Sequence, residues 1–354
     1  MQYVIPVLDR RGAGLGNELI HWGKAFIAAE ELSMKLLHPA WGINPRKYWR
    51  YFQTSRTDFI TQKAIRTIFP TVRFCEEDFL RHSGDDFASA LAAFAWENQL
   101  RERKPIVLEI DGLWGGPGLL EPAREFIRGR LLATRWTAAN LYAIARRTGM
   151  ERLKIGVHLR RGDFDEPVSV NAYSGRFNIS LPLEWYEATM SSLYKGLGER
   201  AVFVIATDAS PEEIYPLTSR FPCVTTFDLP NGDISDLLAL SACDFLVCSV
   251  SSFSLWAAFL GEMPYAWFRP QLNLADEHLS IWGYQDLQKL ERSPTGHALA
   301  SVASTAEGDM NPRGLAVSED GNIPDETIDR LKRAWQEKSR ATDLIRYGVV
   351  KEKK

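Results

Sequence analysis

Apolar and polar residues alternate along residues 153–160, where Ile155, Val157 and Leu159 are separated by smaller or polar residues. A period of two is typical of a β-strand. Further apolar runs predict strands at 201–206, 223–227, 245–250 and 264–268, and helices are predicted to start at Pro182, Ser210, Ser235 and Ser251. Strands that alternate with helices form a parallel sheet with right-handed crossovers. The second half is therefore predicted to be a Rossmann-like α/β domain.

The first half carries fewer signals of the same kind. Strands are predicted at 3–8 and 105–110, and helices at 18–36, 59–69, 86–104 and 121–148. Gly149 and the new strand pattern after it place a domain boundary near residues 148–152. We expect an N-terminal domain over 1–150, with the glycine-rich loop, and a C-terminal Rossmann-like domain over 151–300. A C-terminal loop and helix over 301–354 is expected to pack back on the N-terminal domain.

The composition is that of an ordinary globular protein. The 354 residues are 45% hydrophobic and 25% charged, with a formal net charge of -3, which argues against broad binding to nucleic acid. No apolar segment resembles a signal peptide or is long enough to cross a membrane, so we expect a cytoplasmic protein without stable membrane insertion. The four cysteines form no C-x-x-C pair and are expected to be reduced. Nothing in the pattern sets the oligomeric state.

Charged residues follow several of the predicted strands. Arg160 and Arg161 end the strand at 153–160. Two adjacent arginines suit an anion such as a diphosphate, because arginine stays charged and presents a rigid fork of donors. Asp208 follows the next strand and Asp236 lies near the start of a later helix, and either carboxylate suits a base edge or a ribose. In a parallel sheet these positions share one edge, where open α/β sheets bind ligands. Taken singly, each residue could equally be a surface ion pair, a turn residue or a helix cap.

A glycine-rich loop precedes the first predicted helix. Gly12, Gly14 and Gly16 alternate just before Asn17. Strand, glycine loop and helix in this order point backbone N–H groups at a phosphate. A tight turn explains the glycines equally well, because the spacing is not that of the dinucleotide fingerprint.

Residues 38–58 combine five aromatic residues with four basic residues. Such a segment could cover a sugar or a nucleotide. It could also be an amphipathic segment whose rings pack inward, with the basic side chains in solvent.

Four segments resemble the motifs of one enzyme family. His-Leu-Arg-Arg-Gly-Asp at 158–163 resembles the first motif of the fucosyltransferases that form α1,2 and α1,6 linkages, and Ile-Ala-Thr-Asp at 205–208 resembles the second. The run 236–258 resembles the third. Its Ser-Ser-Phe-Ser-Leu-Trp-Ala-Ala part is most similar to the α1,2 enzymes, and Asp-Phe-Leu-Val-Cys is also similar to the α1,6 enzymes of N-glycan cores and nodulation factors. Gly-Leu-Gly-Asn-Glu at 14–18 resembles the Gly-Leu-Gly-Asn-Gln of the α1,2 family.

The resemblance implies a GT-B glycosyltransferase: α/β, with two Rossmann-like domains facing a cleft. It implies an inverting, metal-independent transfer of fucose from GDP-fucose to a glycan acceptor, with no cofactor and with the α1,2 linkage to a galactose-type sugar favoured. Arg160, Arg161 and Asp163 are the implied catalytic residues, with the two arginines on the β-phosphate. The implied nucleotide-binding residues also include His158, Asp208, Asp236, Ser251, Ser252, Phe253, Gly14, Gly16 and Asn17.

Several alternatives stay open. The catalytic base could be Glu18, Asp163, Asp165 or Glu166, and the linkage could be α1,6. Asp163-x-Asp165 is a D-x-D sequence, which in other glycosyltransferases holds a metal-bound diphosphate. Residues 161–163 also spell an Arg-Gly-Asp adhesion tripeptide, and a catalytically dead, carbohydrate-binding relative is the remaining non-enzyme reading.

Overall fold

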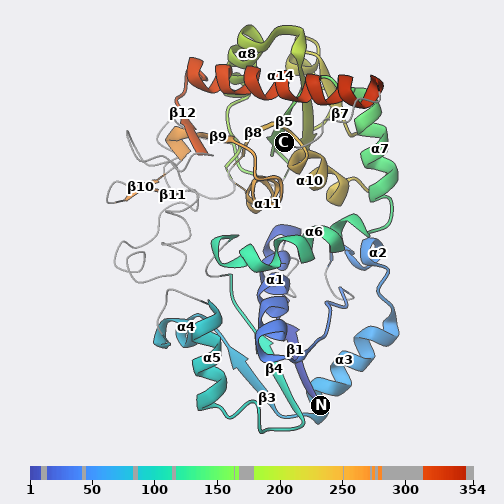
Figure 1. Ribbon diagram of the computed structural model, residues 1–354, viewed down its shortest axis with the longest axis vertical. Helices are drawn as coiled ribbons and strands as arrows, with labels where there is room; N and C mark the ends of the chain where they lie inside the picture. Colours follow the sequence, from blue (N-terminus) through green and yellow to red (C-terminus); the bar gives the residue numbers. More distant parts are fainter. Residues whose placement is uncertain are drawn as a thin grey trace. The chain divides into compact units, whose positions relative to one another are not determined.

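The computed structural model describes residues 1–8, 14–41, 45–82, 87–113, 117–162, 164–166, 179–249, 251–271, 273–275, 278–280 and 314–347. These residues form two units (Figure 1). Met1–Thr137 belong to the first unit, and the described residues from Ala138 onward belong to the second.

The first unit is built on a parallel sheet of strand order β2-β1-β4-β3. Its strands are β1 (Gln2–Pro6), β2 (Lys35–Leu36), β3 (Thr71–Phe74) and β4 (Ile106–Ile110). Its helices are α1 (Leu15–Leu32), α2 (Trp49–Phe52), α3 (Arg56–Ile68), α4 (Glu76–Arg81), α5 (Phe87–Glu97), the 3₁₀ helix η1 (Pro117–Ala123) and α6 (Arg124–Leu132). Every residue of β4 is buried and α1 is buried on most of its surface, so this strand and helix form the centre of the unit.

The second unit contains a six-stranded parallel sheet of order β12-β9-β8-β5-β6-β7. The strands are β5 (Leu153–Leu159), β6 (Ala201–Thr207), β7 (Cys223–Thr225), β8 (Phe245–Val247), β9 (Tyr265–Phe268) and β12 (Gly314–Val317). The helices are α7 (Thr137–Thr148), α8 (Leu183–Leu197), η3 (Gly198–Arg200), α9 (Tyr215–Thr218), α10 (Asp233–Ser241), α11 (Ser252–Gly261), η4 (Arg269–Gln271) and α14 (Asp325–Tyr347). A small antiparallel pair, β10 (Asn273–Ala275) and β11 (His278–Ser280), follows η4.

Helices cover both faces of this sheet. On β6, Phe203 and Ile205 belong to the same core cluster as residues of α8 and α14. Val202 and Val204, which point to the opposite face, pack with residues of α7 and α10. The prediction of an α/β protein with a Rossmann-like parallel sheet in each half is confirmed for each unit taken by itself.

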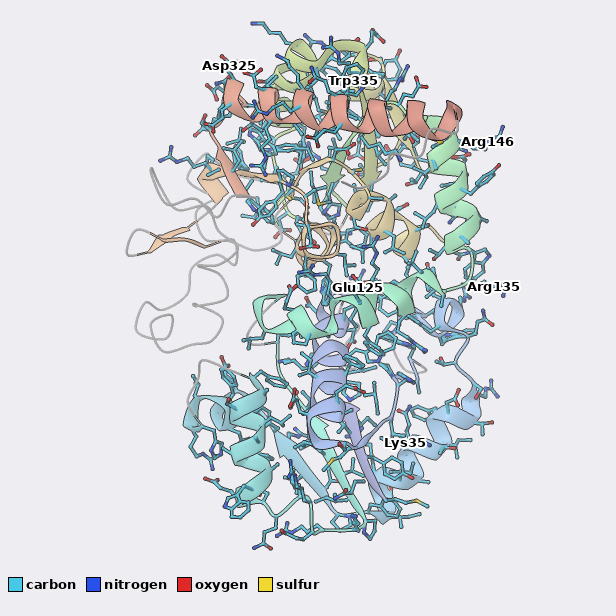
Figure 2. The ribbon with its side chains drawn as sticks, viewed as in Figure 1. Lys35, Glu125, Arg135, Arg146, Asp325 and Trp335 are labelled. Carbon is cyan, nitrogen blue, oxygen red and sulfur yellow. The ribbon has the colours of Figure 1, made fainter. Side chains whose placement is uncertain are left out.

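Two elements belong to a different unit from the one expected. Helix α7, assigned to the first domain from the sequence, packs on the second sheet. Its Arg147 forms a bidentate ion pair with Asp228, and Asn140 donates to Ser235 Oγ at 2.9 Å. The C-terminal segment, expected to pack on the first domain, instead belongs to the second unit. There β12 pairs with β9, α14 packs against α8, and the Trp335 indole donates to Glu151 O at 2.8 Å (Figure 2).

The helix predicted over 121–148 is also interrupted. Its first part is η1 and α6, and the chain turns at residues 133–136 before α7 begins. Trp136 adopts a left-handed backbone conformation (φ 70°), which a continuous helix cannot contain. Among the described residues, no helix is both long and apolar enough to span a membrane.

Candidate functional site

The second sheet has a topological switch point between β5 and β8. After β5 the chain adds β6 and β7 on one side, and then returns to add β8 and β9 on the other. The connections that leave these two strands run in opposite directions, which opens a crevice at their carboxyl ends where α/β sheets bind ligands. Arg160 and Arg161 follow β5, and Ser251 and Ser252 follow β8. The sequence therefore places its arginine pair and its serine pair on the two sides of this switch point.

The register of β5 and β6 brings Arg160 to Asp208. Leu159 pairs with Thr207, so the next residue of each strand lies at the same level. Arg160 Nη1 lies 3.1 Å from Asp208 Oδ2, and the backbone N–H of Arg161 donates to Asp208 Oδ1 at 2.7 Å. One carboxylate thus holds the guanidinium of the first arginine and the backbone of the second. The structure shows Asp208 as an ion-pair partner of Arg160, which is the alternative that the sequence left open beside a role at a base edge or a ribose.

The turn after β5 fixes this arrangement further. The Arg160 guanidinium lies 5.1 Å from the centre of the Phe164 ring, and the Phe164 N–H donates to Arg161 O at 3.1 Å. A Cβ at Gly162 would lie only 3.0 Å from Asp208 Oδ2, so a side chain there would displace the carboxylate. Glycine at this position therefore lets the Asp208 carboxylate pack closely against the turn. Arg160 keeps 21% of its side chain exposed, and a guanidinium is the side chain that suits bidentate binding of an anion such as a phosphate.

His158 lies behind the arginines and is 3% exposed. Its Nδ1 is 2.7 Å from Ser254 Oγ and 3.0 Å from Ser249 Oγ. Burial lowers the pKa of the imidazole to about 3, and the charge of Arg160 acts in the same direction, so the ring is neutral at physiological pH. The two serines belong to the segment after β8 and to α11. His158 therefore links the end of β5 to the start of α11.

The backbone of His158 is also held. Tyr186, on α8, donates its hydroxyl to His158 O at 3.0 Å. Burial raises the pKa of this phenol well above its ordinary value, so it stays a donor. Ser249, Ser254 and Tyr186 were not identified from the sequence, since a buried hydroxyl has no pattern of its own until its partner is known.

The start of α11 presents backbone N–H groups. Ser251 is the N-cap and accepts a hydrogen bond from the Phe253 N–H at 3.3 Å, and Ser252 is the first helical residue. The Phe253 ring centre lies 4.8 Å from that of His158. All three residues predicted here are partly exposed. A helix N-terminus carries a partial positive charge and suits a phosphate.

Asp236 lies in the first turn of α10, a helix that packs against α11 and the sheet. Its Oδ1 is buried and has no hydrogen-bond partner among the residues that the structure describes. Burial raises the pKa of this carboxyl group to about 7, while a hydrogen bond from Thr226 lowers it in part. A buried carboxylate oxygen without a donor is costly, and a ligand that supplies N–H groups would relieve that cost.

The glycine loop belongs to the first unit. Gly14 is the N-cap of α1, and its carbonyl accepts from the N–H groups of Asn17 (3.0 Å) and Glu18 (3.3 Å). Among the described residues, no side chain makes a capping hydrogen bond at this helix start. Gly16 and Glu18 are buried. The role of Gly14, Gly16 and Asn17 as nucleotide ligands stays a prediction, as does that of Glu18 as a base.

The D-x-D sequence is only partly described. Asp163 lies outside the described residues, so its predicted catalytic role is not tested. Asp165 and Glu166 are exposed, and Asp165 O accepts hydrogen bonds from the backbone and side chain of Ser180 at 3.0 and 3.1 Å. Within the described ranges, no group of three or more metal-ligating side chains comes together.

Comparison with known proteins gives matches among solved structures. No family model matches the chain, and no curated protein matches it. The chain is similar to POFUT1 in complex with GDP, with 13% identity and a TM-score of 0.43 over 75% of this chain and 97% of that one. It is similar to NodZ α-1,6-fucosyltransferase soaked with GDP-fucose, with 15% identity and a TM-score of 0.39 over 74% and 92%. It is also similar to fucosyltransferase NodZ from Bradyrhizobium, with 15% identity and a TM-score of 0.42 over 78% of this chain and 97% of that one. Because these identities and TM-scores are low, the function proposed below rests on the site's own residues.

Proposed function

We propose that this protein is an inverting glycosyltransferase that transfers fucose from GDP-fucose to a hydroxyl of a glycan, with an α1,2 linkage to a galactose-type sugar. The observation that carries the proposal is the arginine pair held by Asp208 at the switch point of the second sheet. The choice of fucose and of the α1,2 linkage comes from the motifs at 158–163, 205–208 and 236–258.

Arg160 and Arg161 act on the departing diphosphate. As the bond to the sugar breaks, negative charge grows on the β-phosphate and positive charge grows on the sugar ring. Cations that are already in place stabilise that charge more in the transition state than in the ground state. Asp208 and the Phe164 ring hold Arg160 before the nucleotide binds, so little reorganisation is needed. The N-terminus of α11 adds backbone donors for the same diphosphate.

Asp236 suits the base. Guanine offers an N–H and an amino group on one edge, and a carboxylate can accept from both. Asp236 has a buried oxygen that lacks a donor among the described residues, whereas both oxygens of Asp208 already accept hydrogen bonds or an ion pair. Of the two carboxylates that the sequence offered for the base or ribose, Asp236 is the better candidate. His158 positions the start of α11 against the end of β5 through its contacts with Ser249 and Ser254.

The acceptor hydroxyl must attack opposite GDP, since the anomeric centre inverts, and a carboxylate that takes its proton would assist. Asp163, Asp165, Glu166 and Glu18 remain the candidates. The arginines provide the charge that a metal ion provides in other glycosyltransferases, so we propose a reaction without metal or cofactor. A metal bound at Asp163-x-Asp165 is the competing proposal.

Calorimetry and product analysis test the proposal. Wild-type protein is titrated with GDP, GDP-fucose, GDP-mannose and UDP-galactose in EDTA and then with Mn²⁺. We expect guanine-nucleotide binding in EDTA and GDP release with a galactose-terminated acceptor. Arg160→Ala should reduce turnover by about 10²-fold or more, while Arg146→Ala, which removes an exposed arginine on α7, should not change it. Nucleotide binding only with metal, or near-normal turnover of Arg160→Ala, would contradict it.

The α1,6 linkage is the second candidate, because Asp-Phe-Leu-Val-Cys at 244–248 is similar to the α1,6 enzymes. NMR of the fucosylated product separates the two linkages directly. Tight GDP binding without transfer to any acceptor would indicate the catalytically dead relative.

A further inference from the structure

The first unit carries a surface that the proposed reaction does not use. Helix α3 has thirteen residues, and none of them is buried. Helices in globular proteins are stabilised mostly by burying an apolar face. A helix without a buried residue therefore raises the question of what its exposed apolar side chains contact.

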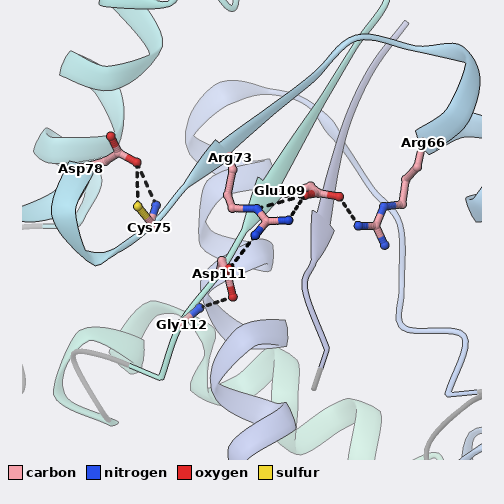
Figure 3. Close-up of polar contacts among 7 residues, drawn as sticks. All are labelled: Arg66, Arg73, Cys75, Asp78, Glu109, Asp111 and Gly112. Carbon is pink, nitrogen blue, oxygen red and sulfur yellow. Dashed lines mark hydrogen bonds and ion pairs between the residues drawn. The ribbon is translucent and has the colours of Figure 1, made fainter. Parts of the chain in front are cut away.

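One side of α3 is attached to its own unit. Gln62 donates to His38 O, Arg66 pairs with the buried Glu109 (Figure 3), and the Phe69 ring stacks on Tyr3 at the end of the helix. Residues 62, 66 and 69 lie on one face of a helix, because its neighbours recur every three or four positions. That face is the inner one.

The opposite face of α3 is apolar at its centre and basic along one edge. Ile60 and Ile68 are 63% and 72% exposed, and Ala64 lies between them at the same helical spacing. Arg56 and Lys63, seven residues apart, are both exposed along one edge of this row, and Thr61 and Asp58 follow the other edge. The outer face thus has isoleucine side chains in solvent with cations along one edge.

The segment before α3 carries further exposed basic and aromatic side chains. Tyr48 and Tyr51 are buried, and the Tyr51 carbonyl accepts from the Arg135 N–H at 3.0 Å, which anchors the turn and α2. Trp49 is 43% exposed, with the Arg50 guanidinium 5.6 Å from its ring centre. Only residues 53–55 separate α2 from α3. We define the basic face by its exposed residues: Arg46, Lys47, Trp49, Arg50, Arg56, Ile60, Lys63, Ala64 and Ile68.

The charge of this region opposes that of the whole chain. Residues 45–68 contain six lysines and arginines and a single acid, Asp58, whereas the chain has a formal net charge of -3. Asp58 is bound in a capping box with Ser55, and its hydrogen bonds from that residue lower its pKa. A local excess of basic residues therefore lies in the same segment as the exposed Ile60 and Ile68.

We propose that the basic face docks the protein on a bilayer surface that contains anionic phospholipid. The cations of the basic face would meet the lipid headgroups, while Trp49, Ile60 and Ile68 enter the boundary with the acyl chains. A soluble acidic polymer would explain the cations but would leave the isoleucines in water. The α3 helix is about 20 Å long, so it lies on the surface and the attachment is peripheral and reversible. This inference does not depend on the proposed reaction.

Vesicle sedimentation with the full chain tests it. Vesicles of phosphatidylcholine alone are compared with vesicles that contain roughly one-third phosphatidylglycerol, and salt is varied. We expect binding to the anionic vesicles only. Removing both charges in Arg56→Gln/Lys63→Gln should weaken it by about 30-fold, since each basic residue contributes about fivefold. Ile60→Ser/Ile68→Ser should weaken it by about tenfold or more.

Matched controls come from the second unit. Arg146→Gln/Arg333→Gln removes the same charge from exposed positions, and Met150→Ser/Tyr215→Ser removes side chains of similar exposure (65% and 66%). Both controls should bind like wild type. Equal losses in the controls, or no preference for anionic vesicles, would overturn the proposal.

Two further readouts guard against misfolding and against the acidic-polymer explanation. Brominated lipid should quench Trp fluorescence in the wild type and less in Trp49→Phe, a change that is too small to unfold the protein. If heparin binds the protein while Ile60→Ser/Ile68→Ser keeps full vesicle binding, the surface recognises acidic polymers and the membrane proposal is wrong.

Discussion

Asp236→Asn should make the ligand-free protein more stable at neutral and alkaline pH. Asp236 is largely buried, its Oδ1 has no partner among the described residues, and burial raises the pKa of its carboxyl group to about 7. The folded protein therefore resists ionising a group that the unfolded chain ionises readily. Asparagine has the same shape and no charge, so it removes that cost.

The sign and size of this stability difference follow from the linkage between proton binding and folding. Between pH 3.8 and about 7 the folded protein holds a proton that the unfolded chain has released. The free energy of unfolding then falls by about 1.4 kcal/mol for each pH unit, or about 4 kcal/mol in total. Asp236→Asn should therefore be more stable than wild type by up to about 4 kcal/mol at pH 8, and the difference should disappear near pH 4. The lost hydrogen bond with Thr226 reduces this gain.

Urea unfolding of both proteins from pH 4 to pH 8 measures the difference directly. Other titrating groups are common to both chains and cancel. Asp233→Asn is the matched control, because Asp233 lies in the same helical turn and is exposed. A stability difference that does not change with pH, or that is equally large for Asp233→Asn, would refute the reasoning.

Ionisation of the same carboxyl group, which destabilises the ligand-free protein, should strengthen nucleotide binding. If guanine donates to Asp236, binding favours the ionised carboxylate, so GDP affinity should fall by up to tenfold per pH unit below about 7. Asp236→Asn should lose about 10- to 100-fold in GDP affinity, because a hydrogen bond to a charged group is replaced by a weaker one. Calorimetry in buffers of different ionisation enthalpy would show proton release on GDP binding at pH 6. If Asp236→Asn is stabilised but binds GDP with normal affinity, Asp236 does not belong to the nucleotide site.

Three further predictions concern the end of β5. Asp208→Asn should change the free energy of unfolding by no more than about 1 kcal/mol, since the ion pair is partly exposed. It should lower kcat/KM by about tenfold or more, because Arg160 loses the carboxylate that positions it. Unchanged kinetics would show that Asp208 does not position the arginine for the reaction. Gly162→Ala should lower kcat/KM with little change in Tm, because its Cβ displaces the Asp208 carboxylate; Gly129→Ala, at a site with open space, is the control. The His158 imidazole, with its pKa lowered to about 3 by burial, should not titrate between pH 5 and 8 in NMR spectra assigned with His158→Gln; a midpoint near 6.5 would contradict its burial.

The strands of the second sheet could be predicted because their apolar periods are strong. The strand predicted at 153–160 corresponds to β5, and the strand predicted at 201–206 corresponds to β6. The edge strand β12 was missed, since Gly314–Val317 is four residues long and follows a polar stretch. Its pairing with β9 depends on a distant partner, and a local pattern does not contain that information.

The site was predictable in its position but not in its contacts. Strand ends share an edge in any parallel sheet, so Arg160, Asp208 and Ser251 could be placed near one another from the sequence. The burial of His158 and its two serine partners required the packing of α11 on β5. The raised pKa of Asp236 required knowing how little solvent reaches α10.

The register of β5 and β6 explains why the first two motifs act together. Arg160 and Asp208 are far apart in the chain, yet the pairing of Leu159 with Thr207 sets them side by side. Their separation is fixed by the spacing of strands in a sheet and not by the length of the connecting chain. The aspartate that ends the second motif thus holds the arginine that follows β5. If the protein binds the nucleotide that we propose, Asp236 of the third motif is the better carboxylate for the base, because its buried Oδ1 has no hydrogen-bond partner among the described residues, whereas both oxygens of Asp208 already have partners.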